Sequence, residues 1–253
     1  MVKLTTRDKR ILGKCADALW LTTSQVHALF FKDKTLDAVR KRLRKLAEAN
    51  YLKAVQTRYF IDSFHTLDDA GVSFVRLTRP GIQLRRSIPE HLEHLTAIND
   101  VRVSVESSDS NLRFFYAHWE LSALGWKYPV IPDAAFSVVT DRTSTCMVEI
   151  DRGTELSKDI QRKFEGYAMV ALTFPFDAVI LLTLSPKGRT RSERLWAETE
   201  KPFAILLGTY SDMQRDGMWR MQFRHIGDGT RSGSLLSLCE EHASGEEESD
   251  KTG

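Results

Sequence analysis

Cysteine is scarce in this chain of 253 residues, which has only Cys15, Cys146 and Cys239. An odd number without a CxxC spacing supports neither a disulfide framework nor a zinc site, and it indicates a reducing compartment. No apolar run reaches the roughly 18 to 20 residues of a membrane span, and the amino terminus lacks the apolar core of a signal peptide. These absences predict a cytoplasmic protein without membrane contact.

Several catalytic patterns are also missing from the sequence. It has no glycine-rich loop that would hold a phosphate, no GxSxG motif, and no isolated cysteine with a convincing histidine partner. The composition is otherwise that of a globular protein, with 42% hydrophobic residues. A chain of this length most plausibly holds two domains, because domains commonly have about 100 to 200 residues.

Positive charge is concentrated at the amino-terminal end of the chain. The formal net charge is +2, yet residues 1–62 hold fourteen Lys or Arg against six Asp or Glu, a net +8, which leaves −6 for the remainder. A basic module on a mildly acidic body is typical of a protein that places one end on a polyanion. Double-stranded DNA is therefore the expected partner.

Three helices and a hairpin are predicted within this basic segment. Apolar residues at helical spacing follow Thr5-Thr6, and Thr22-Thr23 caps a second, shorter helix. A third helix follows Thr35, with apolar residues at the 3.6-residue period and basic residues on the other face. Two β-prone runs at 51–55 and 59–61 form the hairpin.

This order of elements resembles a winged helix-turn-helix domain, expected over residues 1–80. Such a domain places its third helix in the major groove of DNA and its hairpin against the backbone. A basic helix that is only a solvated face remains the alternative. The expected DNA-binding residues are Lys34, Thr35, Arg40, Lys41, Arg44, Lys45 and Arg58.

Residues 81–238 predict a second domain of the α/β class with a mixed sheet, which makes the whole chain α+β. The main expected elements are a helix at 89–105, strands at 134–139 and 144–150, a helix at 157–172, and a strand at 176–184 that is buried on both faces. Shorter expected elements are a strand at 112–116, an edge or turn at 119–121, a helix start at 66–71, a helix at 193–200 and a strand at 218–223. The glutamate-rich residues 239–253 predict a disordered acidic tail.

Acidic residues stand at the ends of two neighbouring predicted strands. Asp133 opens the first strand and Glu149 closes the second, so a hairpin would bring both carboxylates to one edge of the sheet. Carboxylate oxygens suit Mg²⁺ or Mn²⁺, which in a phosphodiesterase site activates a water and clamps the phosphate. Asp151 occupies the position where such a core normally carries lysine. Lys158 or Lys163 on the following helix could supply it, although the direction of Lys163 is ambiguous.

Three interpretations of this acidic cluster stay open. In the first interpretation the cluster is an active nuclease site with Asp133, Glu149 and Lys163 as catalytic residues. Otherwise Asp133, Glu149 and Asp151 bind a metal ion without efficient cutting. In the third interpretation the cluster positions DNA or is structural, with Asp151, Arg152 and Glu155 forming a salt-bridged strand-to-helix connection and Asp133 capping a turn.

Several segments together resemble a known family. They are His91–Leu95 with Asn99–Val101, then Pro132–Ala134, then Glu149–Glu155, and finally Lys163 with Tyr167. In these segments the chain resembles the replication-relaxation family of bacterial plasmids and other mobile elements, over about residues 5–185. The resemblance implies a winged-helix domain joined to a restriction-endonuclease-like domain of the PD-(D/E)XK type, with a role in plasmid replication and DNA relaxation. It matches Asp133 to the first acid of the nuclease motif and Glu149 to the second.

Three functions are compatible with these features. The first is a DNA-binding protein of a mobile element that controls replication or transcription, needs no cofactor for DNA binding and acts as a homodimer. Its nuclease-like domain would then be inactive and serve dimerisation or DNA gripping. The alternative is a metal-dependent endonuclease or nickase that uses Mg²⁺ or Mn²⁺. A weaker third possibility is a protein-binding adaptor whose contact is the acidic tail.

Overall fold

The computed structural model describes residues 2–56, 62–82, 84, 91–107, 112–139, 142–153, 156–184, 190, 193–194, 196, 203–226, 232–235 and 237. The chain divides into two compact units, Met1–Val103 and Ser104–Gly253. The boundary expected from the sequence lies at residue 80, whereas this division falls after Val103, inside a helix. The expected acidic tail at 239–253 is outside the described residues.

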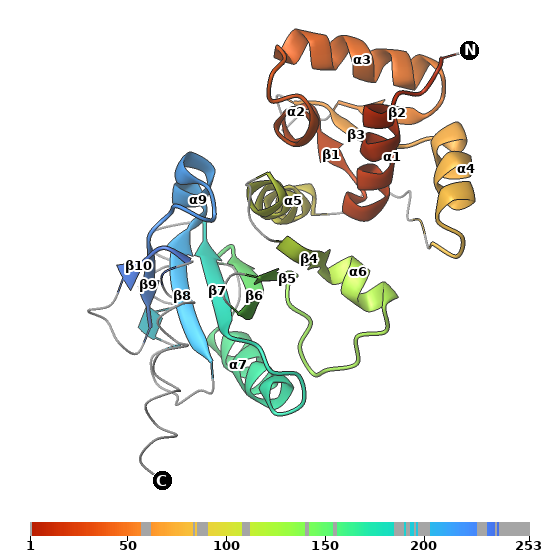
Figure 1. The fold of residues 1–253 in the computed structure, drawn as a ribbon. Helices are drawn as coiled ribbons and strands as arrows, with labels where there is room; N and C mark the ends of the chain where they lie inside the picture. The colour runs from red at the N-terminus through yellow and green to blue at the C-terminus, as the bar shows by residue number, and fades with distance from the viewer. Residues whose placement is uncertain are drawn as a thin grey trace. The chain divides into compact units, whose positions relative to one another are not determined.

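The first unit combines helices with a small antiparallel sheet. Its elements are α1 (Thr6–Ala18), β1 (Leu21–Thr22), α2 (Thr23–Phe30), α3 (Leu36–Glu48), β2 (Leu52–Val55), β3 (Phe64–Leu67), α4 (Asp69–Thr78) and the first part of α5 (Leu92–Glu106) (Figure 1). The sheet order is β1-β3-β2. The three expected helices are present, and the side chains of Thr5, Thr22 and Thr35 each accept a hydrogen bond from the backbone N–H three residues later.

The strand observed beside β2 follows the segment in which the sequence placed the second strand of the hairpin. Residues 59–61 lie outside the described residues, and the strand that pairs with β2 is β3. The helix start expected at 66–71 is observed within that range, at Asp69, because β3 continues through Leu67. All four residues of β3 are buried. Such a strand lacks the alternation of buried and exposed positions by which a sequence reveals a strand.

A buried ion pair connects α3 to α1. The Arg42 Nε donates a hydrogen bond to Asp8 Oδ1 at 2.8 Å, and the Arg42 Nη2 pairs with Asp8 Oδ2. Asp8 is only 1% exposed, while Thr5 also donates its backbone N–H to the same carboxylate at 2.7 Å. The contact fixes one face of α3 toward the core, which leaves the opposite face to solvent.

The second unit is built on a seven-stranded mixed sheet in the order β10-β9-β8-β7-β6-β5-β4. Its strands are β4 (Leu112–Ala117), β5 (Ala134–Val139), β6 (Thr143–Asp151), β7 (Ala178–Thr183), β8 (Ala204–Thr209), β9 (Phe223–His225) and β10 (Ser232–Gly233). Its helices include α6 (His118–Ala123), α7 (Ser157–Ala171) and α9 (Tyr210–Asp216). Strands β6, β7 and β8 run parallel, and the other pairings are antiparallel. The predicted α+β class with a mixed sheet is confirmed.

The connection from β6 through α7 to β7 positions the candidate site. All six residues of β7 are buried, as the continuous apolar run predicted. Helix α7 lies close to its predicted range and packs on one face of the sheet through Ile160, Phe164 and Tyr167 (Figure 1). Lys163, which lies between these apolar positions, is thereby placed beside Glu149 near the end of β6.

Some short predicted elements of the second unit are corrected. Residues 118–123 form a helix rather than an edge or turn, because the Glu120 carboxylate accepts the Ala117 N–H at 2.8 Å and caps it. The last predicted strand begins only at Phe223, since the backbone N–H of Met221 bonds to the Gly217 carbonyl in a preceding turn. Most of the helix expected at 193–200 lies outside the described residues.

Helix α5 begins at Leu92, and residues 85–90 before it are outside the described range. Its buried Asn99 donates from Nδ2 to the carbonyl oxygens of Ala18 at 3.0 Å and Trp20 at 2.7 Å, within the first unit. In the described part of the chain, no helix has the length and apolar character that a bilayer crossing requires.

Candidate functional site

Helix α3 separates apolar from basic side chains. Val39, Leu43 and Leu46 are buried in the core of the first unit. Apart from Arg42, which pairs with Asp8, the side chains between them are exposed. Of the predicted DNA-binding residues, Lys34, Thr35, Arg40, Lys41, Arg44 and Lys45 are exposed, while Arg58 lies outside the described residues.

The exposed residues at the start and along the outer face of α3 differ in the hydrogen bonds and salt bridges that they make. The Thr35 hydroxyl accepts the Ala38 N–H at 3.3 Å and caps the helix. Lys41 pairs with Asp37 at 2.8 Å, one turn earlier. Exposed ion pairs of this kind contribute little, so a phosphate could replace Asp37 at small cost. Within the described residues no salt bridge is formed by Arg40, Arg44 or Lys45.

Asp133 and Glu149 lie across from each other at one end of the β5–β6 pair. Ala134 pairs with Val148, and one further step of this register sets Asp133 opposite Glu149. The Asp133 Oδ2 accepts the backbone N–H of Ile150 at 2.8 Å, and Glu149 is only 3% exposed. The hairpin thus brings the two acids together, as the strand assignment implied.

Helix α7 supplies a lysine and a tyrosine to Glu149. The Lys163 Nζ lies 2.8 Å from Glu149 Oε2, and the Tyr167 hydroxyl donates to Glu149 Oε1 at 2.5 Å. The two residues are four positions apart, so they lie on the same face of the helix. Lys158, the other lysine considered from the sequence, is exposed. The ammonium group therefore reaches the site from α7 and not from strand position 151.

The pKa of Glu149 is raised to about 7, chiefly by burial and also by the nearby charge of Asp133, while Lys163 and Tyr167 act in the opposite direction. Two neighbouring carboxylates resist simultaneous ionisation because their charges repel. A cation between or beside them relieves this repulsion. Lys163 provides one such positive charge, and the remaining negative charge favours a second cation.

The two carboxylates of Asp133 and Glu149 match the small number of protein ligands that a Mg²⁺ ion commonly uses. Mg²⁺ commonly takes one or two carboxylates and completes its coordination with water and substrate phosphate oxygens. The third predicted ligand, Asp151, accepts the Gly153 N–H at 2.6 Å through Oδ1. Among the residues that the structure describes, no group of three or more His, Cys, Asp or Glu is placed to hold a metal ion. Metal binding by Asp133, Glu149 and Asp151 stays a prediction.

Tyr167 is the residue of this cluster that the sequence did not identify as part of the site. In the sequence Tyr167 stands out only as part of the family resemblance, which gives its hydroxyl no role. The available signal was its spacing of four from Lys163, which predicts a shared helical face. Glu155, which the structural interpretation pairs with Asp151 and Arg152, lies outside the described residues.

Comparison with known proteins adds the family to this geometry. A family model described as replication-relaxation matches residues 12–178, which is well over half of the chain. The match includes Asp133, Glu149 and Lys163. No curated protein and no solved structure matched the chain. The chain belongs to the replication-relaxation family.

Proposed function

We propose that the chain is a DNA-binding protein with a replication-related role in a mobile element. The observation that carries the proposal is α3, whose apolar face is buried while Arg40, Lys41, Arg44 and Lys45 are exposed. It is the third helix of the first unit, whose elements from α1 to β3 are ordered helix, strand, helix, helix, strand, strand. In a winged-helix domain the helix at this place enters the major groove of double-stranded DNA. Membership of the replication-relaxation family supports the replication context.

The triple variant Arg40→Ala, Lys41→Ala and Arg44→Ala tests this assignment. Each lost phosphate contact lowers the slope of log affinity against log salt by about one. We therefore expect weaker binding to DNA from the chain's own genomic neighbourhood and a slope smaller by up to about three. Fluorescence anisotropy with labelled duplex at several salt concentrations measures both quantities.

A matched control removes three positive charges elsewhere. Arg113, Arg215 and Arg220 are exposed basic residues of the second unit, and their replacement by alanine gives the same change of net charge. This control should bind duplex DNA like the wild type. Undiminished binding by the α3 variant, or an equal loss in both triple variants, would contradict a specific role of α3.

We also propose that the protein binds DNA as a homodimer, because winged-helix regulators commonly occupy paired half-sites. Light scattering should then give two chain masses of 28.9 kDa each, either for the free protein or for the DNA complex after the mass of the duplex is subtracted. A single-chain mass in both states, at the concentrations used for binding, would rule the dimer out.

A metal-dependent endonuclease or nickase is the second candidate function. It is favoured by one observation, the placement of Lys163 Nζ at 2.8 Å from Glu149 Oε2 beside Asp133. This arrangement puts an ammonium group and two carboxylates together without a lysine at position 151. A bound Mg²⁺ or Mn²⁺ would lower the pKa of a water and neutralise phosphate charge. In that arrangement Asp133 and Glu149 bind the ion, and Lys163 stabilises negative charge on the phosphate.

Supercoiled plasmid carrying the chain's genomic neighbourhood provides the test, with Mn²⁺ or EDTA. An active site predicts metal-dependent nicking that is lost in Glu149→Ala and strongly reduced in Lys163→Ala. Lys158→Ala is the matched control, because Lys158 is an exposed lysine on the same helix, and it should nick normally. Intact plasmid in every reaction would leave DNA binding without cleavage.

A further inference from the structure

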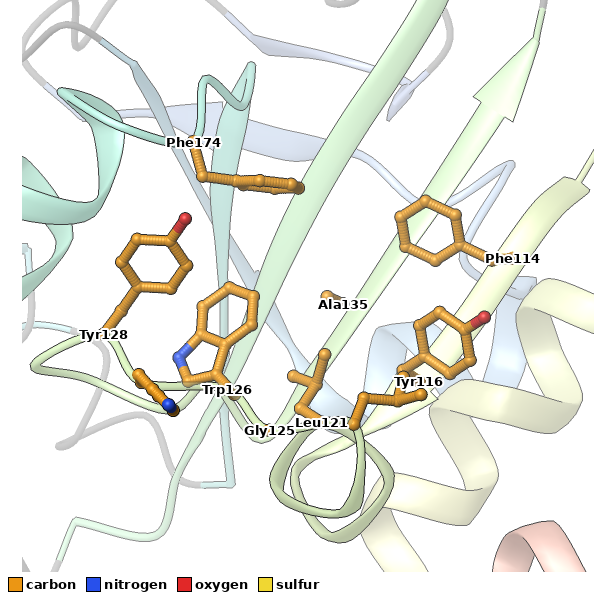
Figure 2. Close-up of a pocket in the computed structure, with 10 residues that line it drawn as sticks. Phe114, Tyr116, Leu121, Gly125, Trp126, Tyr128, Ala135 and Phe174 are labelled. Atoms are coloured by element: carbon orange, nitrogen blue, oxygen red, sulfur yellow. The ribbon is translucent and has the colours of Figure 1, made fainter. Parts of the chain in front are cut away.

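An open aromatic pocket of about 480 Å³ lies in the second unit. Figure 2 shows its rings in two groups on either side of Ala135, with Trp126, Tyr128 and Phe174 in one group and Phe114 and Tyr116 in the other. The volume is within the roughly 300 to 1,000 Å³ of ligand pockets. All five rings are only partly buried, so their faces remain accessible.

The rings are held in place by packing and by one hydrogen bond. Trp126 and Tyr128 meet edge to face with centroids 4.8 Å apart, and Trp126 meets Phe174 at 5.9 Å. Across the pocket, Phe114 and Tyr116 are stacked at 5.2 Å. The Trp126 Nε1 donates to the Val130 carbonyl at 2.7 Å. The pocket therefore presents aromatic faces that need little rearrangement to receive a flat ligand.

The pocket opens on the same sheet face as the carboxylate cluster. Tyr116 pairs with Ala135, which pairs with Met147, so these three side chains share one face. Glu149 is two residues beyond Met147 and points to that face too, as its contacts with α7 require. Asp133 precedes Ala135 by two residues, a distance of about 7 Å along an extended chain. The pocket-lining Ala135 and the carboxylate of Asp133 therefore belong to the same short stretch of chain.

We propose that this pocket binds an unpaired base of a DNA strand whose backbone passes Asp133, Glu149 and Lys163. The proposal rests on the proposed DNA-binding function and adds the kind of DNA that the second unit recognises. Aromatic side chains bind bases of any sequence through stacking. A base inside a duplex is already stacked and paired, so only an unpaired or extruded base has its faces free.

Polar groups at the pocket suit a base better than an aliphatic ligand. Within the described residues no hydrogen bond is made by the hydroxyl of Tyr116, so it is available to the polar edge of a base. Lys127 lines the pocket and is exposed, which places a positive charge where a phosphate would follow the base. A purely aliphatic partner would leave these groups without a counterpart.

The test compares two double variants of the full chain. Tyr128→Leu with Phe174→Leu keeps apolar side chains but removes two aromatic faces, while Tyr128→Phe with Phe174→Tyr keeps both rings as the matched control. Binding to fluorescein-labelled oligothymidylate, which has no base pairing of its own, is measured beside binding to a duplex of equal length. We expect the leucine variant to bind the single strand about 5- to 150-fold more weakly than wild type, with duplex binding unchanged. The control should bind both like wild type.

The possible results separate the pocket from the proposed function. Equal single-strand binding by wild type and leucine variant, with duplex binding intact, overturns the pocket and leaves the role of α3 standing. Absence of all DNA binding by wild type at low salt overturns both. A change of sedimentation from dimer to monomer in the leucine variant would show that the pocket is an interface between copies, and would also overturn the inference.

A second measurement uses the wild type and does not depend on the folding of the leucine variant. Stacking of a base on Trp126 should quench part of the intrinsic tryptophan fluorescence as oligothymidylate is added. Trp126→Phe keeps a ring, so it should still bind the oligonucleotide while that part of the quenching is lost. Binding without any quenching in wild type, or quenching unchanged in Trp126→Phe, would place the bases elsewhere.

Discussion

Asp8 is a buried carboxylate that the fold tolerates because Arg42 reaches it. Burial alone would raise the pKa of Asp8, but hydrogen bonds from Arg42 and Thr5 reverse this effect and lower the pKa below its ordinary value. A carboxylate with a lowered folded pKa stabilises the fold above its unfolded pKa near 4, and this contribution is lost as the pH falls through the folded value. The ion pair is therefore a stabilising feature at neutral pH.

Replacing Arg42 by alanine should lower the free energy of unfolding by about 3 kcal/mol at pH 7, because it leaves Asp8 buried without a counter-charge. Urea unfolding followed by circular dichroism measures the change. Arg44→Ala is the control, since Arg44 is exposed on the same helix and should alter stability by less than about 0.5 kcal/mol. Equal stabilities of the two variants would contradict the role of the buried pair.

The buried His65 makes the free energy of unfolding depend on pH, and the shift of its pKa gives the sign of this dependence. Burial lowers the pKa of His65 to about 4, while Asp62 acts weakly in the opposite direction. Between pH 6.5 and 4 the unfolded chain takes up a proton that the folded chain excludes, so acidification lowers the free energy of unfolding. Urea unfolding at pH 7 and pH 4.5 should show a loss from this group of about 2 kcal/mol.

His65→Gln separates this contribution from those of the acids. Glutamine does not titrate and offers a polar partner to the Thr23 hydroxyl, which lies 2.9 Å from His65 Nε2. The difference in stability between the two pH values should shrink by about 2 kcal/mol in this variant. An unchanged pH dependence would show that His65 is protonated in the folded state.

At the scale of elements, helix α4 approaches the strand segment before β2 so closely that one position requires glycine. A Cβ on Gly71 would lie 2.1 Å from the backbone oxygen of Tyr51, and backbone atoms cannot move away as a flexible side chain can. Gly13, within α1, has nothing within 4 Å of such a Cβ. The two glycines therefore differ in whether a methyl group is accepted.

Alanine substitution at these two sites should change stability in opposite directions. Gly71→Ala is expected to lower the free energy of unfolding by about 2 kcal/mol through the forced displacement of α4. Gly13→Ala should raise it by up to about 1 kcal/mol, because alanine favours the helix. Thermal and urea unfolding of both variants would test this, and a Gly71→Ala protein as stable as wild type would contradict the close approach.

The success of sequence-based prediction also differed between elements for physical reasons. Helix α7 and strand β7 were predicted nearly at their observed bounds, because one has a 3.6-residue apolar period and the other a continuous apolar run. Strand β3 is not predicted by the sequence, because it is short and buried on both faces. Helix α6 was missed because six residues are too few to display a period.

At the scale of the whole molecule, the two units carry opposite charge. Met1–Val103 holds nineteen Lys or Arg against eleven Asp or Glu, a net +8, and the rest of the chain has −6. A net charge of +2 for the chain therefore conceals a strongly basic unit. Such a division favours DNA contact through the first unit and predicts that the attraction is screened by salt.

Wild-type affinity for duplex DNA should consequently fall at least about 100-fold when salt is raised from about 50 to about 200 mM, if the four exposed basic residues of α3 each contact a phosphate. Anisotropy titrations over this range give the slope. Affinity that does not respond to salt would contradict a phosphate-contacting α3. No affinity even at low salt would instead favour a protein-binding adaptor.

The sequence by itself determined the features that depend on neighbours along the chain. These include the threonine caps of the first helices, the apolar stripe of α3, the buried strand β7 and the carboxylates at the ends of adjacent strands. Tertiary structure decided what depends on residues far apart in sequence. It turned Lys163 and Tyr167 toward Glu149, paired Arg42 with Asp8, and gathered aromatic rings from β4, the loop before β5 and the segment after α7 into one pocket. Periodicity shows which face of an element is buried, but the packing of elements against each other selects the partners.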